Sequence, residues 1–184
     1  MRWAVVLVVA CASAAPKPPP IENRAPALPA PPPSISMVDQ IVRAELEHWL
    51  GDPTWLPDGK LLDSPGPILM LRDVEIAHMA NDAVTTDMQH IAPSALPTGP
   101  RTYALMSKDA LQAEADRIGH EVTYIAFDVT FFAGASDAHV GFEVRELLPS
   151  ATKGMLLCCC GATDLFASHD GRWTLTKRHA VVCS

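Results

Sequence analysis

The hydrophobic and polar positions at the C-terminal end of the chain predict two strands joined by a tight turn. Asp170-Gly171 is a dipeptide that the two-residue I′ turn of a β-hairpin favours, and β-competent segments lie on both sides of it. With a two-residue turn, His169 faces Arg172. Cross-strand pairs set the register of such a hairpin. The register places Phe166 opposite Leu175, Asp164 opposite Lys177, Cys160 opposite Val181 and Cys158 opposite Cys183.

Two helices are predicted by apolar residues at helical spacing. The first begins at Ser36, whose hydroxyl can cap free N–H groups, and ends at Gly51 before Pro53. The second begins at Ser107 and ends at the C-cap Gly119. The apolar stripes are Val38, Ile41, Val42, Leu46 and Trp49 in the first helix, and Leu111, Ala115 and Ile118 in the second.

The segments between these elements predict further strands. Residues 121–132 and 139–148 form a second hairpin, whose later strand alternates apolar and polar residues. Residues 52–66 have loop composition, 68–76 and 102–106 are strand candidates, and 77–100 are compatible with a short helix or an irregular crossover. Helices and antiparallel strands in this order predict an α+β domain over 36–184. Its helices pack on a curved antiparallel sheet of four or more strands, ending in a long C-terminal β-hairpin.

The N-terminal residues indicate export. Arg2 and the apolar segment 3–10 have the organisation of a signal peptide. Residues 8–11 (VVAC) resemble the lipobox of bacterial lipoproteins, and this resemblance implies that residues 1–11 are a signal peptide and that Cys11 carries the lipid. Ordinary secretory cleavage after Ala12-Ser13-Ala14 is the alternative. Residues 12–35 are a Pro-rich linker that favours extended polyproline II conformation.

The order of the elements in 36–184 and the closing strand DGRWTLTKR are similar to those of nuclear-transport-factor-like folds and, more loosely, of cystatin-like folds. The resemblance implies a cone-shaped α+β architecture. It brings no catalytic residue that matches a position of this chain.

Charge and motifs exclude several classes of function. The formal net charge is −7, which lacks the basic footprint of a nucleic-acid-binding protein. The sequence contains no phosphate-binding loop, serine-nucleophile elbow, zinc-protease motif or calcium loop. We therefore expect no cofactor and no nucleic-acid partner.

The cysteines predict a disulfide in the exported compartment. Cys158 and Cys183 face each other in the hairpin register, so we expect them to form the bond; a one-residue bulge would shift the partner to Cys159. The alternative is a metal site formed by the cysteine triplet with His179. Adjacent strand residues point to opposite faces and zinc motifs space their cysteines differently, so no metal is expected.

Three polar residues share the apolar face of the C-terminal hairpin: Asp164, Lys177 and His179. They are candidates for the mouth of a pocket, with His179 as acid–base and Asp164 as its charge partner. A cross-strand ion pair beside a satisfied histidine is the structural alternative. Asp128 is a second buried-strand acid that is either paired or functional.

These observations favour an exported, lipid-anchored binding module of the bacterial cell envelope, at the outer membrane or in the periplasm. Its partners would be the membrane, through the lipid anchor, and an envelope protein or a small apolar ligand. One alternative is a cone-shaped hydrolase or isomerase that uses the His179–Asp164 pair. Another is a cystatin-like inhibitory or structural module.

Overall fold

The structure is a computed structural model that describes residues 35–51, 61, 66–80, 83–133, 136–152, 160–179 and 181–183. Contacts divide the chain into two units, Met1–Pro33 and Ser34–Ser184, and every described residue belongs to the second. Several sequence expectations therefore fall outside the described residues: the signal segment with Cys11, nearly all of the linker, most of the loop 52–66, and the two cysteines Cys158 and Cys159.

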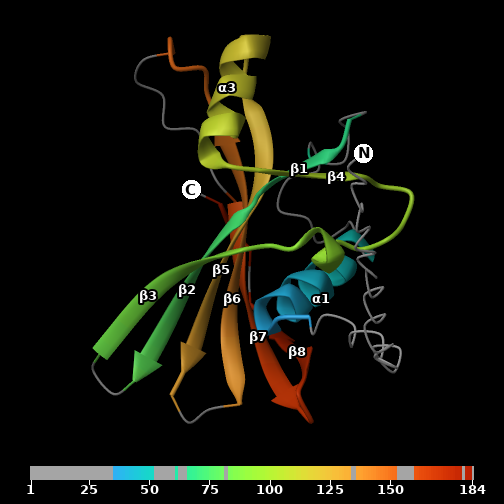
Figure 1. Ribbon diagram of the computed structural model, residues 1–184, viewed down its shortest axis with the longest axis vertical. Helices are drawn as coiled ribbons and strands as arrows, with labels where there is room; N and C mark the ends of the chain where they lie inside the picture. Colours follow the sequence, from blue (N-terminus) through green and yellow to red (C-terminus); the bar gives the residue numbers. More distant parts are fainter. Residues whose placement is uncertain are drawn as a thin grey trace, which may run out of the picture. The chain divides into compact units, whose positions relative to one another are not determined.

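The described chain contains two α-helices and nine strands of one sheet (Figure 1). In chain order the elements are α1 (Met37–Gly51), β1 (Ile68–Leu71), β2 (Asp73–Ala80), β3 (Ala83–His90), the 3₁₀ turn η2 (Pro93–Ala95), β4 (Tyr103–Met106), α3 (Lys108–Ile118), β5 (Val122–Phe132), β6 (Asp137–Leu147), β7 (Cys160–His169), β8 (Arg172–Arg178) and β9 (Val182–Cys183). Neither α-helix is both long and apolar enough to cross a membrane.

The two helices begin and end where their capping residues predict. Ser36 Oγ accepts a hydrogen bond from the Asp39 backbone N–H at 3.0 Å, which satisfies a free donor at the start of α1. Ser107 Oγ does the same for Ala110 in α3, at 3.2 Å. Gly119 ends α3 in the left-handed conformation, with φ of 75°. All five apolar residues of the first predicted stripe are buried.

The sheet is larger than predicted, and it is mixed. Its main path runs β3-β2-β5-β6-β7-β8, with β1 paired to β4 and β5, and β9 paired to β7. Most pairs are antiparallel, but β1–β4, β1–β5 and β2–β5 are parallel. The expectation of an all-antiparallel sheet is therefore wrong, whereas the α+β class is consistent with two helices and a mostly antiparallel sheet.

The region from 68 to 100 differs most from its prediction. A break at Arg72 divides the expected strand 68–76 into β1 and β2. The ambiguous segment 77–100 forms the second half of β2, all of β3 and the turn η2, rather than a helix. β3 is exposed on both faces over most of its length. Its sequence therefore shows neither the apolar stripe of a helix nor the alternation of a strand with one buried face, and the prediction had no signal to use.

Each helix covers a different face of the sheet. Residues of α1 form the main core with Ile68, Met70 and Ile125 on one face. Leu111 and Ala115 of α3 form a second cluster, which includes Leu69 and Tyr124, on the other face. Alternating strand residues point to opposite faces, so β1 and β5 contribute to both clusters. This explains why Tyr124 to Phe127 are all buried, as the apolar run predicted for a strand covered on both sides.

The C-terminal hairpin has the predicted turn and, near it, the predicted register. Asp170 and Gly171 both have positive φ, 51° and 76°, as a I′ turn requires. His169 pairs with Arg172, and Phe166 pairs with Leu175. A bulge then shifts the register between Leu165 and Phe166. Beyond it Asp164 pairs with Arg178 rather than Lys177, and Cys160 pairs with Cys183 rather than Val181.

Candidate functional site

The three residues predicted to share a pocket mouth are separated by the bulge. Asp164 is fully buried on the α1 face of the sheet. Lys177 pairs with Leu165 and is exposed, so the prediction that it shares a face with Asp164 is wrong. His179 contacts Asp164 through its backbone, whose N–H donates to Asp164 Oδ1 at 3.3 Å. Its ring Nδ1 lies 2.7 Å from the Thr163 carbonyl oxygen.

Arg178 takes the position beside Asp164 that the sequence assigned to Lys177. Its Nε donates to Asp164 Oδ2 at 3.2 Å, and its side chain is only 16% exposed. The extra residue of the bulge turns Arg178 onto the covered face of the sheet. An arginine is well suited there, because its planar guanidinium can bind a carboxylate and lie flat on an aromatic ring.

Trp49 of α1 is the aromatic ring that Arg178 covers. The guanidinium carbon lies 3.9 Å from the indole centroid, within the range of a cation–π interaction. The indole also stacks on Phe142 of β6, with 4.7 Å between the ring centroids and an interplanar angle of 13°. Trp49 is fully buried. The Arg178–Trp49–Phe142 contacts therefore join α1 to the β6–β7–β8 part of the sheet.

Glu45, one helical turn before Trp49, completes this buried group. The Trp49 indole N–H donates to Glu45 Oε1, while Oε2 of the same carboxyl has no hydrogen-bond donor among the described residues. Burial, followed by the nearby Asp164 carboxylate, raises the pKa of Glu45 to about 8. A proton on Glu45 allows this carboxyl to donate a hydrogen bond to Asp164, which removes the repulsion between two buried carboxylates.

The sequence contained a signal for Glu45 but none for Arg178. Glu45 lies in the apolar stripe of α1, three residues after Val42 and four before Trp49. A charged residue at such a position indicates a buried partner. Arg178 reaches the same face only because of the bulge, and nothing in the sequence marks a bulge at that place.

Cys183 is bonded to Cys160, with 2.09 Å between the sulfur atoms. The expected partner of Cys183 was Cys158, so that prediction is wrong. The bulge and a further shift before β9 move the pairing by two residues. A shift of two keeps the partner side chain on the same face of β7, whereas a shift of one, to Cys159, would not.

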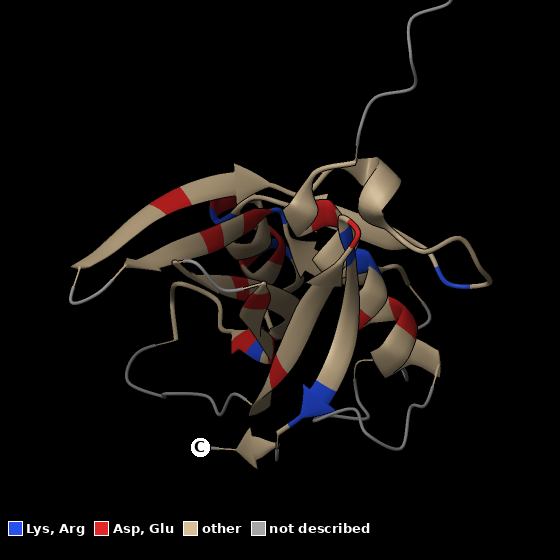
Figure 2. Cartoon of the chain, turned by 90° about the horizontal axis from the view of Figure 1, so that it is seen from below, with Lys and Arg blue, Asp and Glu red and all other residues tan. Residues whose placement is uncertain are grey.

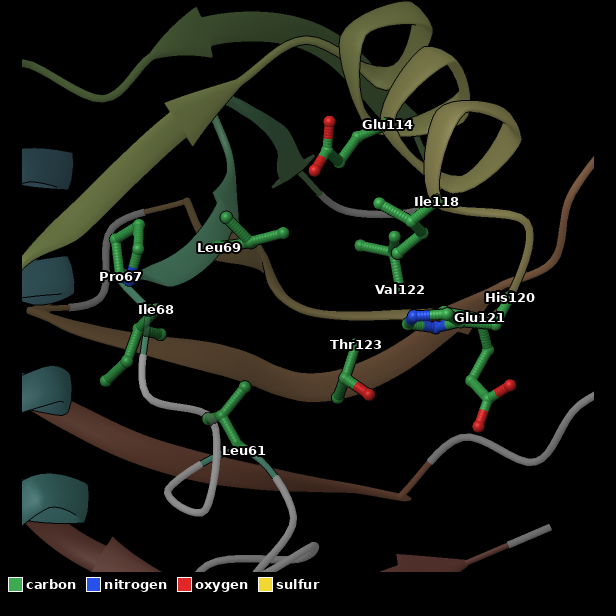
Figure 3. A pocket seen from close by; sticks show the side chains of 11 residues that line it. Leu61, Pro67, Ile68, Leu69, Glu114, Ile118, His120, Glu121, Val122 and Thr123 are labelled. Atoms are coloured by element: carbon green, nitrogen blue, oxygen red, sulfur yellow. The ribbon is translucent and has the colours of Figure 1, made fainter.

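A cavity lies elsewhere, where the C-terminal end of α3 meets β1 and β5 (Figure 3). Its volume is about 440 Å³, within the range of small-molecule sites. Leu69, Ile118 and Val122 point toward one another across it (Figure 3). The described residues that line it are Leu61, Gly66, Pro67, Ile68, Leu69, Glu114, Ile118, His120, Glu121, Val122 and Thr123. Sequence reasoning missed this site because its residues come from separate segments with no motif.

The polar side of this pocket is acidic. Glu114 and Glu121 belong to its lining, and the described residues of that lining include no lysine or arginine. Arg117 donates two hydrogen bonds to Glu114, and these hold the pKa of Glu114 below its usual range. Glu121 has no ion-pair partner among the described residues. The last turn of α3 also presents the negative end of the helix dipole to the pocket. Both features favour a cationic group.

Asp128, the second acid singled out in the sequence, lies on the face of the sheet opposite α1. Its carboxylate covers Gly141 of β6 so closely that a Cβ at Gly141 would lie 2.1 Å from Oδ1. Desolvation in this position, followed by the Glu143 carboxylate, raises the pKa of Asp128. Arg145 opposes this effect. A side chain at position 141 would require the Asp128 carboxylate to move. Asp128 lies outside the pocket beside α3.

The remaining surface carries charges of both signs. Figure 2 shows basic positions on several elements of the chain, mixed with acidic ones. Among the described residues, no group of three or more histidine, cysteine, aspartate or glutamate side chains is arranged to hold a metal ion. Comparison of the chain with protein-family models, with curated proteins and with solved structures finds no match.

The raised pKa of Glu45 makes stability depend on pH. In the unfolded chain this carboxyl titrates near 4.5, and in the folded chain near 8. Between these values the folded protein holds a proton that the unfolded protein lacks, so stability falls as pH rises. We predict that Glu45→Gln removes this loss. The stability difference between the variant and the wild type should grow from about pH 5 to pH 8.

Chemical denaturation across this pH range measures that difference. The matched control is Glu47→Gln, because Glu47 is an exposed acid on the same helix. Its stability should follow the wild-type curve at every pH. Parallel curves for Glu45→Gln and the wild type would mean that Glu45 holds no proton in the folded protein.

Proposed function

We propose that this chain is an exported, lipid-anchored binding module of the cell envelope. We further propose that the cavity beside α3 is its binding site, and that the ligand is a small molecule with an apolar body and a positively charged end. The observation that carries this proposal is the lining of the cavity. Apolar side chains from β1, α3 and β5 face one another there. The described residues of the lining also include two carboxylates and the ionisable His120, but no lysine or arginine.

The size and the charge of the cavity support a ligand of this class. A volume of about 440 Å³ holds a small organic molecule rather than a single ion. The apolar residues favour its body through the hydrophobic effect. Since Glu114 already binds Arg117, Glu121 is the carboxylate that remains for the positive end of a ligand.

The geometry does not favour the alternative of a His179–Asp164 enzyme. Catalysis by this pair needs the imidazole ring to contact the carboxylate where substrate can reach both. The His179 ring instead contacts the Thr163 carbonyl. Asp164 is fully buried and bound by Arg178, so no substrate proton can reach it without displacing α1. We therefore propose binding rather than acid–base catalysis.

The Cys160–Cys183 disulfide supports the export part of the proposal, because stable disulfides belong to oxidising compartments. The lipid anchor rests on the resemblance of residues 8–11 to a lipobox. The curved, cone-shaped sheet of nuclear-transport-factor-like folds likewise remains part of the proposal. It is compatible with a mostly antiparallel sheet that α1 covers on one face.

The binding site is tested with three fluorescent probes that share a dansyl group and a six-carbon chain: monodansyl hexanediamine, dansyl hexylamine and dansyl aminohexanoic acid. They end in an ammonium, a methyl and a carboxylate group. We predict that the ammonium probe binds most tightly and the carboxylate probe most weakly. Ile118→Lys should abolish binding of all three, because it places a charged chain among the apolar residues of the lining.

Glu121→Gln should weaken only the ammonium probe, by roughly tenfold, the value of one charge-assisted contact. The matched control is Glu75→Gln on β2, which removes the same charge from an exposed position outside the cavity. Equal loss in both variants would show that net charge, not the site, attracts the probe. Equal binding of all three probes would contradict the proposed ligand class.

The anchor is tested separately, by mass spectrometry of the mature N-terminus of protein purified from membranes. We predict that the first residue is Cys11 carrying a lipid. Cys11→Ser should release the protein from the membrane fraction. An unmodified N-terminus at Ala15 would instead show ordinary secretory cleavage and no anchor.

A further inference from the structure

β3 forms an open edge of the sheet. It begins the strand order, and among the described residues it pairs only with β2 (Figure 1). Edge strands usually carry a lysine, a proline or a bulge that prevents pairing with another chain. β3 contains neither lysine nor proline, and its eight pairs with β2 run without a register shift. Of the features that block a further strand, the edge carries only one charged residue, Asp87.

Two hydrogen bonds show which backbone groups of β3 point outward. Met79 accepts a bond from the Ala133 N–H at 2.7 Å, so the backbone of Met79 faces β5 and not β3. Arg72 accepts from the Ile91 N–H at 2.9 Å. Backbone groups alternate along an antiparallel strand. The odd-numbered residues of β3 therefore bond to β2, and the backbone groups of Val84, Thr86 and Met88 point away from the sheet.

Two of these three residues carry the large exposed apolar side chains of the edge. Val84 is 57% exposed and Met88 is 60% exposed. They lie on the sheet face opposite α1, since Gln89 on the other face donates to Ser36 at the start of α1, at 2.7 Å. Exposed branched and long apolar side chains beside free backbone groups are the features of a surface that accepts another strand.

We propose that β3 pairs antiparallel with β3 of a second copy of this chain, about a twofold axis at Thr86. Val84 then pairs with Met88 of the second copy, Thr86 pairs with Thr86 of the second copy, and Met88 pairs with Val84 of the second copy. Each pair uses the outward backbone groups and exchanges two hydrogen bonds, as alternate pairs of an antiparallel ladder do.

The edge is self-complementary in this register, which is why a second copy is the occupant. The two apolar residues face each other across the axis on both sides. Asp87, the only acidic residue of β3, faces Thr85 of the second copy rather than another Asp87. In a register shifted by one residue, the apolar side chains of one copy would no longer lie opposite apolar side chains of the other copy. A twofold axis through a shared strand edge is also a closed arrangement that leaves no further edge at β3.

Disulfide trapping in the full chain tests the proposal. Residues in a hydrogen-bonded antiparallel pair have Cα atoms about 5.5 Å apart, within the reach of a disulfide. Thr86→Cys should therefore give a covalent dimer under mild oxidation, and the wild type should not. The matched control is Thr85→Cys on the same exposed strand. Its two copies are offset by two residues and lie roughly 8 Å apart, so they should remain unlinked.

The register is tested by mixing two variants. Val84→Cys and Met88→Cys should each give no covalent dimer alone, and should form an intermolecular disulfide when mixed. Equal crosslinking of Thr85→Cys and Thr86→Cys would show random collision and overturn the proposal. Trapping of a different protein at Thr86→Cys, or no crosslink in any variant, would also overturn it.

Discussion

The ion pair between Arg178 and Asp164, beneath Trp49 and beside Glu45, is the interaction on which the arrangement of this structure depends. Charged groups out of water are costly unless each one has a partner. Here the guanidinium binds the carboxylate and lies on the indole, and the indole N–H binds Glu45. Removal of any one member would leave another buried without its partner. The group therefore fixes the position of α1 on the sheet.

The bulge in the C-terminal hairpin is the backbone feature that makes this group possible. Without it, Lys177 would face Asp164, and Arg178 would point to the other side of the sheet. The register shift that brings Arg178 inward also leads β9 to the position where Cys183 meets Cys160. The bulge thus brings the charged group together and supplies one of the two single-residue shifts that lead to the disulfide.

The two faces of the sheet have different roles as a result. The α1 face is filled by the main core and the charged group, so its acids serve packing rather than binding. The other face is only partly covered by α3, and the pocket lies where α3 ends against β1 and β5. The expectation of a site on the α1 face depended on the predicted register, which placed Asp164, Lys177 and His179 together. The bulge changes that register and separates the three residues.

Local signals were sufficient for several elements of this fold. Ser36 and Ser107 mark the helix starts, Gly119 marks a helix end, and Asp170-Gly171 marks the turn. These motifs act within a few residues and depend little on the rest of the chain. The β2–β3 hairpin was missed because an exposed edge strand has no buried face to create a pattern. Arg178 and the pocket were missed because they depend on tertiary contacts between distant segments.

The position of the disulfide is the measurement that tests this account most directly, because a single bond reports the register. Purified protein is digested without reduction, and fragmentation of the linked peptide locates the cysteine bonded to Cys183. The account predicts Cys160, and it predicts that Cys158→Ser leaves the bond intact. A bond from Cys183 to Cys158 would mean an unbroken register with no bulge. Lys177 would then lie beside Asp164, and the buried group that holds α1 would not exist.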